Sequence, residues 1–264
     1  MSRGRAEERA PVSLIVLAIL GAGLFAVPLL GLIWRVPWRQ LPALLTDDVV
    51  IDALGLSLVT SLTSTGIALL LGFPLAWLLA NREFPGRRLV RGLVLLPLVL
   101  PPVVGGAALL FALGRRGLVG EPLYQTTGLV LPFSIWGVVL ATTFVAMPFL
   151  VITVEGALRN LDRRYEGAAA SLGASRWTVL RRVTIPMIAP SLIAGMVLTW
   201  ARAFGEFGAT ITFAGNLQGR TQTLPLAVFV ALESNRDLAV AISLLMVVIS
   251  LAVLVALRER WWKP

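Results

Sequence analysis

Six stretches of this chain contain no charged residue, and each is about as long as a helix that crosses a membrane. They cover residues 12–34, 53–80, 92–114, 122–154, 183–201 and 238–257. A helix needs roughly 20 predominantly apolar residues to cross the hydrocarbon core of a bilayer. Charged residues make up only 14% of the chain, whereas about a quarter is typical of soluble domains. The sequence therefore predicts an all-α, polytopic membrane protein with six transmembrane helices.

The first stretch, 12–34, differs from a cleavable signal peptide. The apolar core of a signal peptide has about 7–15 residues and precedes a cleavage site of small residues. This stretch is longer and ends in LIWRVPW, without such a site. We interpret it as a retained first span, which together with the following outer loop forms an N-terminal part, residues 1–52.

Arginine and lysine are concentrated on one side of the six spans. With the N-terminus inside, the inner segments hold sixteen of the 23 basic residues, and these segments are 1–11, 81–91, 155–186 and 258–264. Cytoplasmic loops of membrane proteins carry such an excess. The pattern predicts a multi-pass protein of the plasma (inner) membrane with both termini in the cytoplasm. The net charge of +9 is then explained by topology and contact with membrane lipid, and no nucleic-acid partner is expected.

Cysteine and histidine are both absent. Their absence excludes disulfides, thiolate nucleophiles, Cys/His metal sites and a histidine general base. We expect no catalytic residue, no metal site and no cofactor. An integral membrane enzyme that uses carboxylates such as Glu155 and Glu206 stays open as an alternative, although the helix spacing puts these two at opposite faces of the membrane.

The second span, 53–80, is rich in hydroxyl side chains. Six of them lie within nine positions, namely Ser57, Thr60, Ser61, Thr63, Ser64 and Thr65. A hydroxyl in a membrane helix can bond to another helix, line a polar path, or bond to a carbonyl of its own helix. We expect some of the six to face the bundle interior and assign Ser57, Ser61 and Thr65 to a candidate translocation path.

The third span, 92–114, contains Pro97, Pro101 and Pro102. Each proline removes a backbone donor, so this helix is expected to be kinked or broken. Membranes tolerate the freed carbonyls only where protein or a cavity covers them. The interruption is therefore either a packing kink or part of a helix shaped around a path.

The apolar stretch 221–232 has twelve residues, which is too few to span a bilayer. It is expected to form an interfacial or partly re-entrant helix on the outer side.

The longest inner segment, 155–186, has the capping residues of a helix–turn–helix. Asp162 is a suitable N-cap for a helix that begins near Arg163. Gly173 can end that helix, and Ser175 can cap a second short helix. The small side chains between its arginines would form a close-packing surface below the membrane. The alternative is an ordinary loop that its arginines hold against lipid headgroups.

This segment resembles the EAA loop of ABC importer permeases, whose pattern is roughly E-A-A-x3-G-x9-I-x-L-P. Both alanines and the glycine match, and Val183, Ile185 and Pro186 match the ending at the expected spacing. The departure is at the first position, where a glycine replaces the glutamate and Glu166 lies one residue earlier, about 100° around a helix. The resemblance implies a coupling helix that docks into a groove of an ATP-binding subunit. The implied coupling residues are Glu166, Gly167, Ala168, Ala169, Gly173 and Pro186.

The chain contains no G-x-x-x-x-G-K-[ST] phosphate-binding loop. It is therefore expected not to be an enzyme itself, and ATP hydrolysis is assigned to a separate subunit.

Two ionisable residues, Arg202 and Glu206, follow the apolar run of the fifth span. At 1.5 Å per residue from Pro186, Arg202 lies about 24 Å along a helix and Glu206 about 30 Å, close to the hydrocarbon thickness. Both are expected at the outer end, where their i, i+4 spacing allows them to pair. Either their charged groups extend to water at the membrane interface, or they face the bundle and shape an outer gate.

The stretch GEFGATITFAGNLQGRTQTLPLAVF, residues 205–229, resembles the corresponding part of molybdate permeases, and sulfate permeases share its GEFGA opening. The resemblance covers roughly residues 50–257 and implies the type I ABC importer permease fold. It implies a permease domain at 53–257 that includes the coupling loop 155–186. The implied substrate is molybdate, and also tungstate, with sulfate or thiosulfate as the alternative.

The implied partners are a second copy of the permease in a homodimer, two ATP-binding subunits at the cytoplasmic face and an extracytoplasmic oxyanion-binding protein. Hydroxyl and amide donors with few fixed charges suit the transit of a small tetrahedral dianion, because a tightly held ion would leave slowly. A non-transporting scaffold or receptor subunit is the remaining rival.

Overall fold

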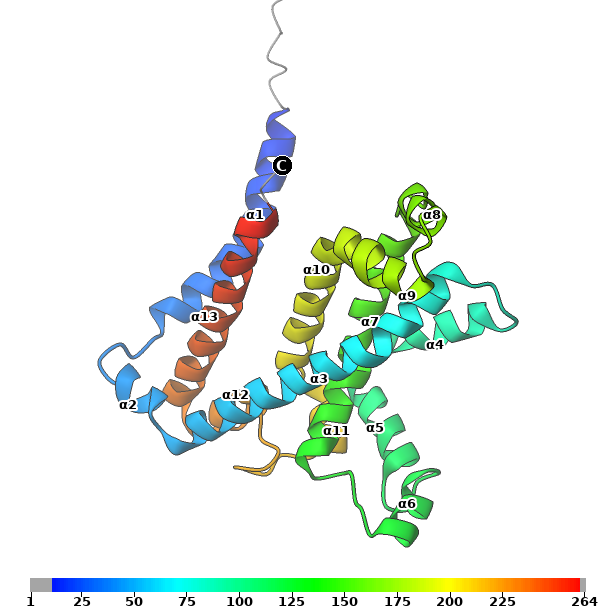
Figure 1. The fold of residues 1–264 in the computed structure, drawn as a ribbon. Coiled ribbons are helices and arrows are strands. Elements are labelled where there is room, and N and C mark those ends of the chain that lie inside the picture. Colours follow the sequence, from blue (N-terminus) through cyan, green and yellow to red (C-terminus); the bar gives the residue numbers. More distant parts are fainter. Residues whose placement is uncertain (1–10, 262–264) are drawn as a thin grey trace, which may run out of the picture.

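The structure is a computed structural model that describes residues 11–261, and the regular structure in that range is entirely helical (Figure 1). The helices are α1 (Val12–Trp34), α2 (Leu41–Leu45), α3 (Asp48–Asn81), α4 (Arg87–Val99), α5 (Pro102–Leu113), α6 (Gly120–Thr127), α7 (Ile135–Arg159), α8 (Arg164–Ser171), α9 (Arg176–Val179), the π-helix η1 (Leu180–Thr184), α10 (Ile185–Phe204), α11 (Gly208–Phe213), α12 (Leu224–Ser234) and α13 (Arg236–Trp261).

Five helices are long and apolar enough to cross a membrane: α1, α3, α7, α13 and the continuous helix Arg176–Phe204. The third expected span is instead divided into α4 and α5. Leu100 and Pro101 between them have extended backbones, with ψ of 134° and 131°. Pro101 and Pro102 cannot donate to a helical ladder, and a residue before proline is pushed away from helical angles. The predicted all-α membrane fold and the broken third span are both confirmed.

The fourth expected span begins later than the uncharged stretch 122–154 indicated. Gly128, with φ of 72°, ends the short helix α6, and Ser134 starts α7 by accepting a hydrogen bond from the backbone N–H of Gly137. The helix then continues past the apolar run to Arg159. The uncharged stretch therefore predicted the wrong start for this span, because the local capping residues decide where the helix begins.

Helix α7 forms the centre of the bundle and packs against both α3 and α10. Small residues allow this close approach, as is common between membrane helices. A Cβ added to Gly72 of α3 would lie 3.2 Å from Met147, and one added to Gly195 of α10 would lie 3.2 Å from Thr153. Helix α1 has no buried residue and packs only loosely beside α13.

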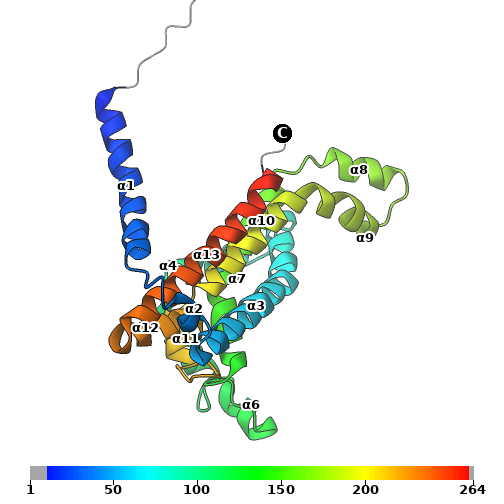
Figure 2. The same cartoon turned by 90° about the vertical axis from the view of Figure 1, so that its left-hand side faces the viewer.

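The two ends of the bundle carry different elements. In both views α8 and α9 lie at the same end as the start of α1 and the end of α13, whereas α6, α11 and α12 lie toward the opposite end (Figures 1 and 2). We call these the α8–α9 end and the α11–α12 end. The expected short helix at 221–232 is present as α12, and its side chains Leu224, Leu226 and Ala227 are buried.

Helices α5 and α11 touch through glycine, which gives a test of the packing. A Cβ added to Gly106 would lie 2.7 Å from the carbonyl oxygen of Ala209. Gly106→Ala is therefore expected to destabilise the protein by about 1–3 kcal/mol, as overpacking does, and to lower the thermal unfolding midpoint measured in detergent. Gly92→Ala is the matched control, because this helical glycine faces open space, where alanine is favoured by about 0.5–1 kcal/mol. Equal midpoints for the two variants would contradict the close contact.

Candidate functional site

Glu206 lies in the turn between α10 and α11, at the α11–α12 end, and is 1% exposed. We call residues 202–209 the Glu206 turn. Its Oε1 accepts a hydrogen bond from the backbone N–H of Ala209 at 2.7 Å, and its Oε2 lies 2.5 Å from Nη1 of Arg202. The arginine side chain is 27% exposed. The expected i, i+4 pair is confirmed, and the carboxylate faces protein rather than lipid.

The Glu206 turn connects three helices. Its carboxylate holds the cation at the end of α10 and a backbone donor in the first turn of α11. A buried charge needs such partners, because desolvation without them is costly. Next to it, a Cβ added to Gly208 would lie 2.9 Å from the Cβ of Pro102, at the start of α5. A movement of this turn would therefore reach α5, the second part of the broken third span, directly.

The hydroxyls assigned to the path are all buried in this conformation. Ser57 accepts a hydrogen bond from the backbone N–H of Leu224 at 2.8 Å and so joins α3 to α12. Ser61 and Thr65 donate to carbonyls of their own helix. The structure gives the three hydroxyls these packing contacts, and their role in a path stays a prediction.

Another hydroxyl of the same helix bonds across the bundle. Ser64 donates to the carbonyl of Val139 at 3.1 Å and lies 2.6 Å from the hydroxyl of Thr142 on α7. Cross-helix bonds and bonds within one helix thus both occur in the second span.

The coupling segment, residues 155–186, contains the expected helix–turn–helix. Asp162 accepts from the backbone N–H of Arg164 at 3.0 Å, and Ser175 accepts from that of Thr178 at 3.2 Å. Gly173 has φ of 84° and ends α8, with its N–H bonded to the carbonyl of Ala170. Only glycine adopts this left-handed backbone without strain.

The expectation that the second helix of this segment is short was wrong. It continues without interruption from Arg176 through η1 and α10 to Phe204, over 29 residues. In a regular α-helix the ring of Pro186 would clash with the carbonyl four residues earlier. The wider turn of the π-helix η1, which lies directly before, accommodates it.

A side-chain bond joins α8 to this long helix. Thr184 in η1 donates to Oε1 of Glu166 at 2.5 Å, and the threonine is 2% exposed. The shifted glutamate therefore faces inward and fastens α8 to the start of the fifth span. Gly167 and Ala168 are exposed, Ala169 is half-buried and Pro186 is exposed.

Large apolar side chains are exposed on the coupling segment, which sequence reasoning did not single out. Tyr165 is 58% exposed, Trp177 is 70% exposed and Leu172 is 89% exposed. Trp177 also borders a hollow of about 780 Å³ between this segment and the end of α3, where Asn81 accepts a hydrogen bond from Arg163. Aromatic residues inside a charged, non-spanning segment were the available signal. Such a surface is typical of a contact with another protein.

The two carboxylates considered for an enzymatic site do not share a cavity. Glu155 lies in the last turns of α7, at the α8–α9 end, and its Oε1 is within 3.0 Å of both Arg91 and Arg159. Glu206 lies at the opposite end. Among the described residues, no three of the carboxylates come together as a metal site. Glu155 and Glu206 therefore do not form an acid–base pair with each other.

Comparison with known sequences gives consistent relatives. The family of binding-protein-dependent transport system inner membrane components matches residues 68–262. The molybdenum transport system permease protein ModB of Mycobacterium tuberculosis is 48% identical over 92% of this chain and 92% of its own length. That of Escherichia coli is 41% identical over 80% and 92%. A probable sulfate transport system permease protein of Marchantia polymorpha is 32% identical over 100% and 93%.

Solved structures share the fold. A bacterial ABC transporter involved in the import of the acidic polysaccharide alginate aligns over 96% of both chains, with a TM-score of 0.72 and 19% identity. The alginate transporter in complex with its pentasaccharide-bound periplasmic protein aligns over 94% of this chain and 92% of that chain, with a TM-score of 0.70. At this identity the likeness establishes the architecture, which is that of ABC importer permeases.

Proposed function

The chain belongs to the family of binding-protein-dependent transport system inner membrane components, and from this premise we propose that it is the membrane-spanning subunit of an ATP-driven importer for molybdate. The ModB relatives, at 41–48% identity over most of the chain, are the observation that carries this proposal. The sulfate permease relative is less similar, at 32% identity. Sulfate or thiosulfate import is accordingly the alternative, and tungstate is a second proposed substrate because it is a tetrahedral dianion like molybdate.

We place the α8–α9 end in the cytoplasm, together with both termini. The positive-inside distribution supports this orientation. Two ATP-binding subunits would dock there on the coupling segment, with the exposed side chains Tyr165, Leu172 and Trp177 in contact.

The permease itself would act as a homodimer with the path at its two-fold axis. An extracytoplasmic oxyanion-binding protein would deliver the substrate at the α11–α12 end. The division into residues 1–52 and a permease domain at 53–257 stays part of this proposal.

The continuous helix Arg176–Phe204 suggests how the two ends communicate. A helix of 29 residues is about 44 Å long. It begins in the coupling segment and ends at Arg202, which holds Glu206. When ATP brings the two ATP-binding subunits together, the coupling helices of the two permease copies would be pulled toward each other. The Glu206 turn would then shift against α5 and open the outer gate.

The proposal is tested by the ATPase activity of the assembled complex in lipid nanodiscs. We expect this chain to co-purify with an ATP-binding subunit, and hydrolysis to rise several-fold when a molybdate-loaded binding protein is added. A sulfate-loaded binding protein is expected to give no comparable rise. Failure to co-purify would support a scaffold or receptor role, and stimulation by sulfate alone would support the alternative substrate.

The bond between Glu166 and Thr184 offers a test of coupling. Glu166→Ala and Thr184→Val are each expected to lower the molybdate uptake per ATP hydrolysed by about fivefold, because a hydrogen bond to a charged group contributes about 1.5–3 kcal/mol and this one is partly exposed. The double variant should be little worse than either single variant, since both remove the same interaction. Thr126→Val, on the exposed helix α6, is the matched control. Additive losses in the double variant would show that the two residues act separately.

A further inference from the structure

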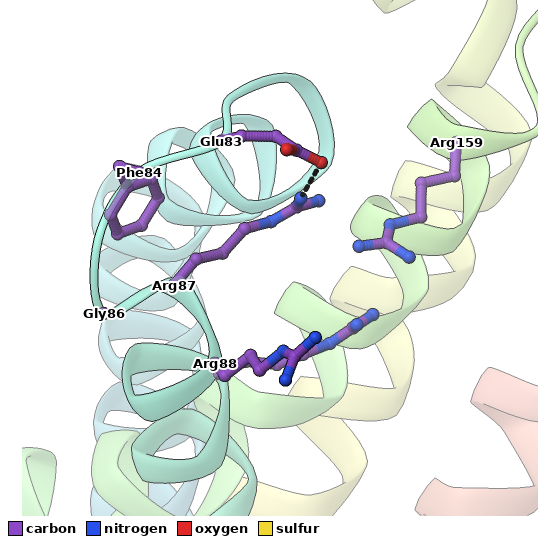
Figure 3. Close-up of a pocket in the computed structure, with 7 residues that line it drawn as sticks. Glu83, Phe84, Gly86, Arg87, Arg88 and Arg159 are labelled. Atoms are coloured by element: carbon purple, nitrogen blue, oxygen red, sulfur yellow. Dashed lines mark hydrogen bonds and ion pairs between the residues drawn. The ribbon is translucent and has the colours of Figure 1, made fainter.

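A pocket of about 450 Å³ lies at the α8–α9 end, between the α3–α4 loop and the last turn of α7 (Figure 3). Four arginines border it: Arg87, Arg88 and Arg91 from α4, and Arg159 from α7. Figure 3 shows Arg88 and Arg159 reaching toward each other from opposite walls. The proposed transport cycle above uses none of these side chains.

Three of the four guanidinium groups are held in place. Arg91 and Arg159 lie 2.9 and 3.0 Å from the same oxygen, Oε1 of Glu155, whose side chain is 5% exposed. Arg87 donates through Nε and Nη2 to the carbonyl of Leu79, at 3.1 and 2.6 Å. Its remaining partner, Glu83, is 95% exposed and lies at 3.3 Å, so this surface pair contributes little. The pocket wall is therefore built and not merely a set of mobile surface side chains.

The charges of the pocket do not balance. Among the side chains of residues 11–256, no carboxylate lies within 4 Å of Arg88, although this arginine points into the same space as the others. Four cations face one buried carboxylate and one solvated carboxylate, which leaves a net charge of about +2 to +3. Like charges gathered in this way repel, and an anion between them would relieve the repulsion.

The level of the pocket in the membrane indicates the source of that anion. Helix α4 continues from Arg91 into an apolar segment whose side chains Leu93 and Leu96 are 59% and 48% exposed, and Leu89 beside Arg88 is 68% exposed. This face is expected to contact lipid tails. Arg88 precedes Leu93 by five residues, or about 7.5 Å along the helix. The arginines thus lie at the boundary between the hydrocarbon and the phospholipid headgroups.

We propose that this arginine pocket binds a tetrahedral oxyanion, the phosphate of an anionic phospholipid in the leaflet at the α8–α9 end. The planar fork of arginine matches phosphate oxygens in pairs, and basic pockets between transmembrane helices bind anionic headgroups. The bound lipid would bridge α4 to α7 and so fix the inner half of the broken third span. Free phosphate or molybdate has similar chemistry, and the experiment separates these sources.

The test is native mass spectrometry of the full chain, delipidated in detergent and titrated with phosphatidylglycerol or phosphatidylcholine. The wild-type protein is expected to retain phosphatidylglycerol at least about fivefold more strongly than phosphatidylcholine, and Arg88→Gln to lose most of this preference, because it removes one charge-assisted contact to the phosphate. Arg82→Gln is the matched control. It removes the same charge from a nearby position in the α3–α4 loop, but Arg82 borders the hollow beside α8 and not this pocket.

Two further arms complete the test. Inorganic phosphate and molybdate are each added at about 1 mM. They are expected not to displace the lipid, since they lack the apolar chains that add to lipid affinity. Displacement by either ion would overturn the lipid assignment in favour of a soluble oxyanion. No preference for phosphatidylglycerol in the wild type, or an equal loss in Arg88→Gln and Arg82→Gln, would overturn the site. Because the readout is binding and not transport, its failure is distinct from failure of the proposed function.

Discussion

Glu206→Ala is expected to reduce ATP-driven molybdate uptake into proteoliposomes by at least about tenfold, which corresponds to 1.4 kcal/mol. The substitution leaves Arg202 without its carboxylate and the N–H of Ala209 without its acceptor. Breaking a buried ion pair costs about 3–5 kcal/mol, and the 27% exposure of Arg202 reduces that cost through solvent screening. The remainder is still enough to displace α11 from α5.

Two further variants separate a loss of gating from a loss of folding. Glu206→Gln keeps an acceptor for Ala209 but removes the charge, so it should retain the fold and still transport poorly. Glu233→Gln makes the same chemical change on an exposed carboxylate of α12 and is expected to leave uptake unchanged. Near-normal uptake by Glu206→Gln in a well-assembled complex would show that the ion pair has no part in the gate.

Gly173→Val is expected to uncouple ATP hydrolysis from uptake. The backbone of Gly173 has φ of 84°, which a β-branched residue adopts only at a cost of about 1–3 kcal/mol. The turn between α8 and α9 would open, and α8 would lose its position relative to η1. We expect uptake to fall by about tenfold or more, in line with that cost, while ATP hydrolysis continues and no longer responds to the binding protein.

The matched control for this variant is Gly21→Val in α1. Gly21 also faces open space, but its backbone is helical and its helix lies outside the central bundle. Both assays, uptake and hydrolysis, are measured on the same proteoliposomes. Normal uptake by Gly173→Val would remove the turn from the coupling mechanism.

Local signals predicted much of this fold. The N-cap Ser175, the turn glycine Gly173 and the proline break of the third span each act on neighbouring residues, so the sequence was enough to predict them. Asp162, predicted as the N-cap of α8, lies one residue before the observed N-cap, Arg163. The pair formed by Arg202 and Glu206 was equally predictable, because helical geometry alone sets its i, i+4 spacing.

Other features depend on contacts between distant segments. The uncharged stretch 122–154 suggested one span, but the caps at Gly128 and Ser134 divide it. The bond from Thr184 to Glu166, and the pocket that Arg88 and Arg159 both border, arise only when helices pack. A single sequence gives no distance between such segments, and the inward orientation of Glu166 therefore came from the structure.

Uptake of radiolabelled molybdate tests the central claim most directly. The chain is reconstituted into proteoliposomes with its ATP-binding subunit and a loaded oxyanion-binding protein, with and without ATP. We predict ATP-dependent accumulation of molybdate. A roughly tenfold excess of sulfate is expected not to reduce it, because a dedicated binding protein sets the affinity. Accumulation of sulfate in preference to molybdate, or molybdate entry that does not depend on ATP, would contradict the account.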